Sequence, residues 1–500
     1  MKRVALALLL VCAPAVARAA DFTEAGDDLA PRDRNFFSVD GALRIRGDVF
    51  YNLDLDRGLT PSGTPLFPVS RSHPKSQTLS GADTRLRTDL AAFAPGGSLA
   101  VKGRVDVQDA TAVGDGPAPQ AALRVKRLYG EVLTPFGLLS AGRMASTWGL
   151  GILANGGDGE DADLGDAADR IGFVTPIAGL LWGAAYDHAT LGPTTKRDTG
   201  DRAAAFDPSD AMQTVTFAVV RWRDDASRER RRGAGKTTLE GGLVGSHRWQ
   251  DSDVSSAYGG AGTTLPRGFT ANALDGWARI TGPWGRIEAE GAILEATVRQ
   301  ASLVPGVLLR QPIHSHQQGG ALETDFGLGA IGAGLDAGFA SGDPQPGFGA
   351  NPQPGAAAAR PGDLDGPQAS LPGDSRVDNF RFHPEYRIDR ILFHEIVGTV
   401  TDAVYLRPHV RGQIAKSARG ALVASVAGVW SRAIYASSTP GGKTPLGVEI
   451  DPTLAWESAD GFAASLEHAV LFPLAGLDNP EAGMRAKPAQ RVRLRLQYRF

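Results

Sequence analysis

Segments of about ten residues in which apolar and polar side chains alternate recur from residue 42 to the end of the chain. In residues 491–500, every second residue from Val492 to Phe500 is apolar, and the other five are four arginines and one glutamine. Alternation with a period of two is typical of a β-strand with one apolar and one polar face. About ten residues is also the length of a tilted strand that crosses a bilayer. The pattern therefore predicts either a membrane barrel or a soluble sandwich whose apolar faces form a core.

The chain begins with a segment that is typical of exported proteins. Lys2 and Arg3 precede an apolar run over residues 4–16, which is shorter than the roughly 17 to 25 residues of a spanning helix. An A-x-A sequence ends at Ala19 and predicts cleavage there. We therefore expect residues 1–19 to be a signal peptide.

Composition narrows the chemistry of the mature chain. The one cysteine, Cys12, lies in the expected signal peptide, so disulfides, thiolate metal sites and cysteine nucleophiles are not expected. Glycine makes up 63 of 500 residues, which disfavours a mainly helical protein because glycine weakens helices. The net charge of −3 gives no reason to expect a nucleic-acid partner.

The connections between the alternating segments favour the barrel. Short joins rich in Gly, Pro and Asp, such as residues 94–97 and 459–461, alternate with longer polar segments. Outer-membrane barrels alternate short periplasmic turns and longer outer loops in the same way. Eighteen strand segments fit the scheme, an even number that returns both termini to one side. We predict an all-β fold, a transmembrane antiparallel barrel of about 18 strands with long outer loops over residues 41–500, after a short periplasmic segment at residues 20–40.

The longest connection spans residues 342–403. Residues 342–373 are rich in Pro, Gly and Ala and are not expected to form regular structure. Apolar residues from Ile388 to Val397 then recur at a spacing closer to that of a helix than to that of a strand. The connection therefore either folds into the lumen as a constriction or adds a hairpin that changes the strand count. The Arg-rich segment after Asp224 is also long for a periplasmic turn.

The polar faces of the predicted strands carry segregated charges. We expect these faces to line the lumen, because an arginine on the lipid side at the bilayer midplane costs about 2 to 4 kcal/mol. The basic pore-lining residues that we predict are Arg44, Arg46, Arg85, Arg87, Lys102, Arg104, Arg491, Arg493 and Arg495. The acidic pore-lining residues that we predict are Glu288, Glu290, Glu323, Asp325, Glu449, Asp451 and Glu467.

Opposed basic and acidic walls would create a field across a water-filled pore, and guanidinium groups can hold a carboxylate or phosphate transiently. The alternative is that the charges form structural ion pairs, which contribute little individually in water. We expect a functional basic track that gives a mild preference for anions. Salt would weaken this preference, because it screens charges over about 8 to 10 Å near physiological strength.

Three sequence elements resemble those of known porins. Residues 127–132, Arg-Leu-Tyr-Gly-Glu-Val, and residues 136–143, which begin with Phe-Gly and end with Gly-Arg, are similar to early-strand elements of general and alginate-export-type porins. The terminal Phe500 resembles the assembly signal that the barrel-insertion machinery recognises. The resemblance implies a porin-like barrel in the bacterial outer membrane, with membrane lipid and that machinery as partners. It leaves the oligomeric state open.

We therefore expect a channel for passive diffusion of small hydrophilic solutes, including anionic ones. A cofactor is not expected, because the sequence has no P-loop or dinucleotide-binding motif in a suitable context. One alternative is a non-conducting surface barrel for adhesion or another interaction. Another is an outer-membrane hydrolase, for which His383, His394, His409 and His468 are available. No nucleophile motif joins these histidines, so we predict no catalytic residue.

Two further motifs contain side chains that can bind metal ions. The acidic segment from Gly157 to Asp169 has carboxylates that could bind calcium, but their spacing differs from that of an EF-hand. We expect a solvated outer loop, placed near a pore mouth. His314 and His316 lack a third ligand at a suitable spacing, so no metal site is expected there.

Overall fold

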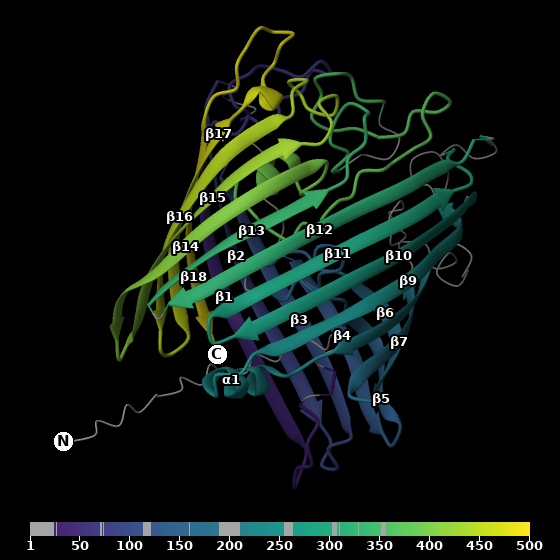
Figure 1. Cartoon of the computed structure of the whole chain (residues 1–500), viewed down its shortest axis with the longest axis vertical. Helices are drawn as coiled ribbons and strands as arrows, with labels where there is room; N and C mark the ends of the chain where they lie inside the picture. Colours follow the sequence, from purple (N-terminus) through teal and green to yellow (C-terminus); the bar gives the residue numbers. More distant parts are fainter. Residues whose placement is uncertain are drawn as a thin grey trace.

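The computed structural model describes residues 25–26, 28–70, 73, 75–113, 122–159, 161–189, 211–254, 264–302, 308–309, 311–328, 330–351 and 357–500. Its strands follow one another around a closed barrel (Figure 1). Each strand pairs antiparallel with the next along the chain, and β1 pairs with both β2 and β18, which closes the ring. The prediction of an antiparallel barrel of 18 strands is confirmed. The expected signal peptide, residues 1–19, lies outside the described residues.

The strands vary in length from nine to nineteen residues. The first nine are β1 (Phe36–Tyr51), β2 (Thr78–Phe93), β3 (Leu99–Val113), β4 (Ala122–Thr134), β5 (Gly137–Ala145), β6 (Ala167–Ile177), β7 (Leu180–Ala189), β8 (Met212–Arg221) and β9 (Thr238–Val254). The others are β10 (Thr264–Gly282), β11 (Gly285–Val298), β12 (Ile313–Leu328), β13 (Ile331–Ala340), β14 (Ala403–Ser417), β15 (Gly420–Ala433), β16 (Pro445–Ser458), β17 (Phe462–Pro473) and β18 (Ala489–Arg499).

The alternating sequence places apolar side chains outside the barrel and charged side chains inside. In β18, Val492 and Leu494 are 40% and 51% exposed, whereas Arg491 and Arg493 are 2% and 6% exposed. A period of two turns successive side chains to opposite faces, so an apolar outer surface and a charged interior arise together. The soluble-sandwich alternative is excluded, because the closed ring leaves the apolar faces on the outside.

Exposed aromatic residues occur toward both ends of the barrel, and one group lies at the end that has the short turns. Members of this group lie in a short turn, close to one, or at the carboxyl terminus. They include Phe136, Trp182, Trp284, Phe462 and Phe500. Aromatic girdles mark the interfaces of transmembrane barrels. We identify this end with the periplasmic side, because short turns face the periplasm in such barrels.

One of the connections on the periplasmic side contains a helix, α1 (Asp225–Gly233), between β8 and β9. Asp224 caps it by accepting a hydrogen bond from the backbone N–H of Ser227, at 2.7 Å. The helix ends near Gly235, which has a φ of 72°. Among the described residues, no helix is long and apolar enough to cross a membrane.

The connection between β13 and β14, residues 341–402, is named the long loop here. Its described part contains a π-helix (Leu392–Val397) and isolated bridges but no paired hairpin, so the extra-hairpin alternative is wrong. Many of its apolar side chains are buried, and Phe380, Ile391 and Phe393 are at most 2% exposed. They pack with inward-facing residues of the strands, such as Tyr405 of β14, and form a hydrophobic core inside the barrel.

Candidate pore constriction

Strand register brings like charges into direct opposition on the inner wall. Arg44 of β1 lies opposite Arg85 of β2, and Arg46 lies opposite Arg495 of β18. Like charges that face each other across a strand pair destabilise a sheet. This wall therefore needs negative groups close by.

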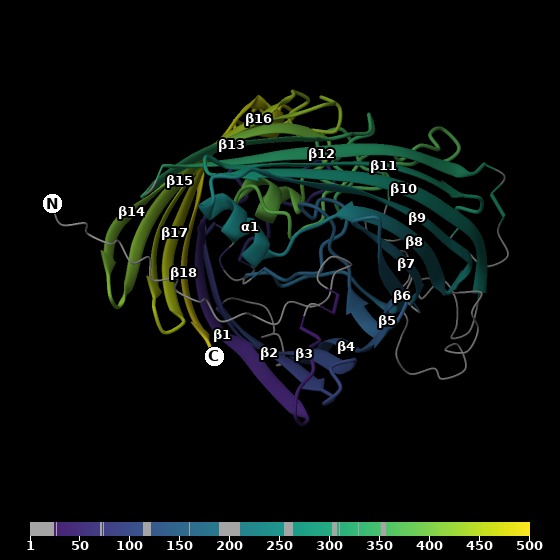
Figure 2. The same ribbon diagram turned by 60° about the horizontal axis from the view of Figure 1, so that its bottom comes forward.

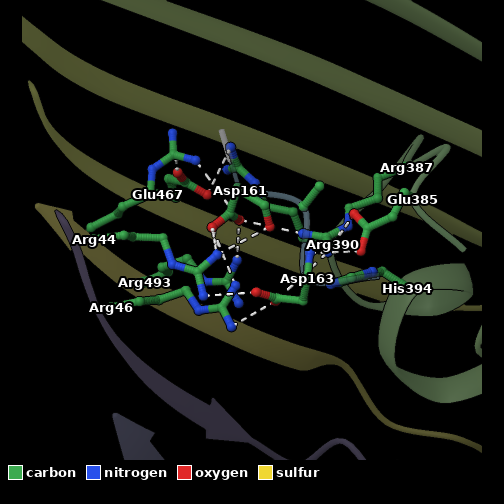
Figure 3. Close-up of polar contacts among 12 residues, drawn as sticks. Arg44, Arg46, Asp161, Asp163, Glu385, Arg387, Arg390, His394, Glu467 and Arg493 are labelled. Atoms are coloured by element: carbon green, nitrogen blue, oxygen red, sulfur yellow. Dashed lines mark hydrogen bonds and ion pairs between the residues drawn. The ribbon is translucent and has the colours of Figure 1, made fainter. Parts of the chain in front are cut away.

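A connection from the outer side supplies these negative groups. We name residues 146–166, between β5 and β6, the acidic loop. Asp161 and Asp163 of this loop point toward the arginines of the wall (Figure 3). Oδ1 and Oδ2 of Asp163 lie 2.8 Å from Arg44 Nη2 and 2.9 Å from Arg46 Nη2. Oδ2 of Asp161 lies 2.9 Å from Nη1 of Arg493.

The same loop contacts the wall at a second position. Oδ1 of Asp158 lies 2.7 Å from Nη1 of Arg104 and 2.8 Å from Nη1 of Arg127. Backbone carbonyls add to these contacts, since Nη1 of Arg87 donates to the oxygen of Gly157 at 3.0 Å. The expectation of a solvated acidic outer loop is therefore wrong. The loop folds inward because the arginine wall offers its carboxylates charge-assisted hydrogen bonds that water cannot match in geometry.

The remaining basic residues pair mainly with carboxylates on the strands. Arg87 forms two hydrogen bonds with Asp106, both at 2.9 Å. Lys102 Nζ lies 2.9 Å from Glu131 and 2.7 Å from Asp28. Further contacts join Arg104 to Asp89, Arg491 and Arg493 to Asp48, Arg495 to Glu467, and Arg85 to Asp163. Every predicted basic residue thus lies within ion-pair distance of a carboxylate.

The acidic loop and the long loop both enter the barrel, and we call them the inserted loops. Two of the predicted acidic residues accept hydrogen bonds from the backbone of these loops. Glu449 of β16 accepts hydrogen bonds from the N–H groups of Arg390, Ile391 and Leu392 at 2.8 to 3.1 Å. These groups lie at the start of the π-helix, where backbone donors lack partners within the helix. Glu290 of β11 accepts from the N–H of Gly151 in the acidic loop at 2.8 Å.

Within the described part of the chain, the other predicted acidic residues do not bind the backbone of the inserted loops. Glu288 and Glu323 both contact Arg286, and the Glu323 pair is 2.9 Å long. Asp325 pairs with Arg411 at 3.0 Å. Asp451 is buried beside the long loop, among the residues that line a cavity described below.

The two inserted loops also bind each other. Oε1 of Glu385 in the long loop accepts from the N–H groups of Asp163 and Leu164 at 2.9 and 2.7 Å. Arg387 lies 2.9 Å from Glu385 and 3.3 Å from Asp161. The loops therefore form one constriction that is held by the basic wall, by Glu290 of β11 and by Glu449 of β16.

Burial and neighbouring charges shift the pKa values of groups in these loops. Burial by itself favours the protonated form of Asp163, but Arg46 and Arg44 hold the pKa of this carboxyl well below its ordinary value. Burial lowers the pKa of His394 to about 3, and Arg387 and Arg491 act in the same direction. His394 is therefore neutral at physiological pH, and Asp163 is ionised.

A cavity of about 310 Å³ remains between the long loop and the inner faces of β14 to β18. Its lining includes side chains from the loops and from β14, β15, β16, β17 and β18. Six arginines line it: Arg387, Arg390, Arg407, Arg411, Arg491 and Arg493. Four carboxylates line it: Asp161, Asp389, Asp451 and Glu467. The lining of the cavity is therefore richer in arginine than in carboxylate.

The histidines that are candidates for a hydrolase or a metal site lie in several different places. His394 and His409 line the cavity, with ring nitrogens 3.6 Å from Glu395 and 3.4 Å from Asp336, respectively. His383 lies 3.7 Å from Asp166, and His468 contacts Gln490 at 3.2 Å. The ring nitrogens of His314 and His316 contact Thr297 and Glu295, both at 3.4 Å.

Comparisons with known proteins give similarity of fold at low sequence identity. No protein-family model matches the sequence, and no curated protein matches it. The crystal structure of the outer membrane protein OpdK from Pseudomonas aeruginosa is 11% identical with a TM-score of 0.49, over 93% of this chain and 98% of that chain. OprD from Pseudomonas aeruginosa is 11% identical with a TM-score of 0.46, over 96% of both chains. OmpT of Vibrio cholerae is 12% identical with a TM-score of 0.36, over 95% of this chain and 100% of that chain.

The architecture of the barrel indicates the cellular location of the protein. A closed ring of 18 antiparallel strands with an apolar outer surface and an aromatic girdle is the architecture of bacterial outer-membrane proteins. The protein is an outer-membrane β-barrel. The finer resemblance to alginate-export-type porins stays a prediction.

Sequence reasoning missed several residues of the cavity. Arg407 and Arg411 lie on β14, where they alternate with the exposed Leu406 and Val410, so the period of two contained the signal. Arg387 and Arg390 lie in the long loop, where the helix-like spacing of the apolar residues did not show whether these side chains face the cavity.

Proposed function

We propose that the protein is a porin-like channel for passive diffusion of small hydrophilic solutes, with a preference for anions. The observation that carries the proposal is the cavity lined by six arginines beside the inserted loops. Guanidinium groups bind carboxylate and phosphate by paired hydrogen bonds, and they keep their charge at any physiological pH.

Not all hydrogen-bonding capacity of these arginines is used within the protein. Among the described residues, Nη2 of Arg491 and Nε of Arg407 are buried and make no hydrogen bond. Both residues line the cavity. Both nitrogens are shielded from solvent, so the preference for anions over neutral solutes of the same size rests on the positive charge of the cavity arginines and not on these two atoms.

The proposal replaces the simple basic track expected from the sequence. All of the predicted basic residues pair with carboxylates, but Arg44, Arg46 and Arg87 are absent from the lining of the cavity, whereas Arg491 and Arg493 contribute to it. We therefore assign selectivity mainly to the arginines of the cavity.

Liposome swelling with a graded set of sugars and organic acids tests the channel directly. Permeability to small solutes, with organic acids faster than sugars of similar size, supports the proposal. No permeability to any of them under verified insertion contradicts it. The double variant R407Q/R411Q should lose the advantage of the acids, whereas the exposed Arg432 of β15 offers a matched control in R432Q.

A further inference from the structure

The arginine-rich helix α1 lies at the periplasmic mouth of the barrel, apart from the cavity. In the view from that end, α1 is inside the ring of strands (Figure 2). In the side view it is at the lower end of the barrel (Figure 1). The helix therefore lies across the opening and not on the lipid-facing surface.

Inward-facing groups of β9 hold α1 in this place. Nε of Arg231 donates to Oγ1 of Thr238 at 3.0 Å, and Nη1 of Arg228 lies 3.2 Å from Oε1 of Glu240. Thr238 and Glu240 are 2% and 1% exposed, whereas Leu239 between them is 55% exposed on the outer face. The helix is thus tied to the lumen side of the strand.

Aromatic stacking adds a second attachment. The guanidinium carbon of Arg228 lies 4.9 Å from the ring centroid of Trp222, which also contacts the ring of Trp277 at 5.7 Å. Arg279 of β10 stacks on both tryptophans at 4.8 and 5.0 Å. Cation–π contacts of this kind fix the position of a charged side chain.

The segment carries more positive charge than its attachments use. Residues 221–236 contain seven basic and three acidic residues, a formal excess of four positive charges. Arg230 and Arg232 are exposed in the last turn of the helix. Basic residues near a helix carboxyl terminus interact favourably with the helix dipole, and these two exposed side chains also place positive charge at the pore mouth.

We propose that α1 forms a second anion-attracting site, which concentrates small anionic solutes at the periplasmic mouth. This inference rests on the proposed channel function but not on the cavity. Positive charge at the mouth of a low-dielectric channel raises the local concentration of anions. Because the charge lies at one end, its effect is greatest when dilute salt bathes that end, where screening is weakest.

Reversal potentials in oriented planar bilayers test the site. The wild type should show a higher anion-to-cation permeability ratio when the dilute solution faces the periplasmic end than when it faces the outer end. R230Q/R232Q removes two of the four excess charges and should reduce this difference by about half when the dilute side is near 0.1 M, where the screening length is about 10 Å. R230K/R232K keeps the charge and should keep the difference.

Arg419 provides the matched control, because it is exposed on another periplasmic turn, between β14 and β15. R419Q removes one charge at the same end of the barrel and should leave the difference unchanged. A conducting R230Q/R232Q channel with the wild-type difference overturns this inference alone, and so does an equal effect of R419Q. A wild type that inserts but does not conduct overturns the proposed function and this inference together.

Discussion

Nη2 of Arg46 and Oδ2 of Asp163 lie 2.9 Å apart, and this ion pair joins the first strand to a loop 117 residues further along the chain. Arg46 lies opposite Arg495 in the strand register, so the carboxylate enters a region where two positive charges face each other. The contact explains both why the wall tolerates its arginines and why the acidic loop lies in the lumen.

Removing the two central carboxylates of the acidic loop should release it. In D161N/D163N the side chains keep their shape but lose the charge that binds the arginines. We expect a higher conductance and a loss of about 1 to 3 kcal/mol in the free energy of unfolding, less than for fully buried pairs because water reaches the lumen. Single-channel recording and denaturant unfolding measure the two effects.

Asp169 provides the control for this variant. It pairs with Arg143 at 2.9 Å, but both side chains are about half exposed, at 49% and 51%. D169N should change stability by less than about 1 kcal/mol and leave the conductance unchanged. Equal conductance of D161N/D163N and the wild type would show that the acidic loop does not narrow the passage.

The acidic loop should stay in place when the solution is moderately acidic. The pKa of Asp163 in the folded protein is below its ordinary value of 3.8, because Arg46 and Arg44 outweigh the effect of burial. The stability from this group is therefore fully present above the ordinary value and is lost only as the pH falls through the lower folded value. Conductance should not rise through loop release between about pH 7 and about pH 4. A conductance increase in this range that is absent from D161N/D163N would contradict the assignment.

Glu449 should control the position of the π-helix. E449A leaves three N–H groups without their acceptor, two of them in buried contacts, and each buried group can cost about 1 to 3 kcal/mol. E449Q keeps one acceptor oxygen and should be less destabilising. Protease cleavage within the long loop, followed by gel analysis, should be faster in E449A than in E449Q. Equal rates in both variants and the wild type would remove Glu449 from the anchoring of the loop.

The terminal residue should matter for closure as well as for assembly. The backbone N–H groups of Phe500 and Gly41 each donate to the carbonyl of the other residue at 3.0 Å. Deletion of Phe500 removes these two hydrogen bonds, worth about 0.5 to 1.5 kcal/mol each, and removes the predicted assembly signal. Heat-modifiable gel mobility should show a smaller folded fraction in the native host. An undiminished folded fraction would separate Phe500 from assembly.

The strands were predictable because alternation with a period of two gives a strand one apolar and one polar face. When one face contacts lipid, the apolar face must be the outer one. Residues 491–500 read as a strand in the sequence, and the structure has β18 at Ala489–Arg499. The helix α1 had a weaker signal, namely the capping residue Asp224 followed by residues of high helix propensity.

The inserted loops could not be predicted in the same way. The partners of Asp163 at Arg46 and Arg44 are well over one hundred residues away in the sequence, and no local periodicity gives the direction of a loop. Acidic composition alone is also typical of a solvated loop. Only the register that places Arg44 opposite Arg85 creates the need for counter-charges inside the barrel.

The reversal potential of the wild-type channel under a salt gradient is the most direct test of the account. Six arginines in the cavity lining predict a reversal potential of the sign that marks anion preference, and a weaker preference at about 1 M salt, where the screening length is about 3 Å. Cation preference at low salt would contradict the account, because the carboxylates and not the arginines would then control permeation.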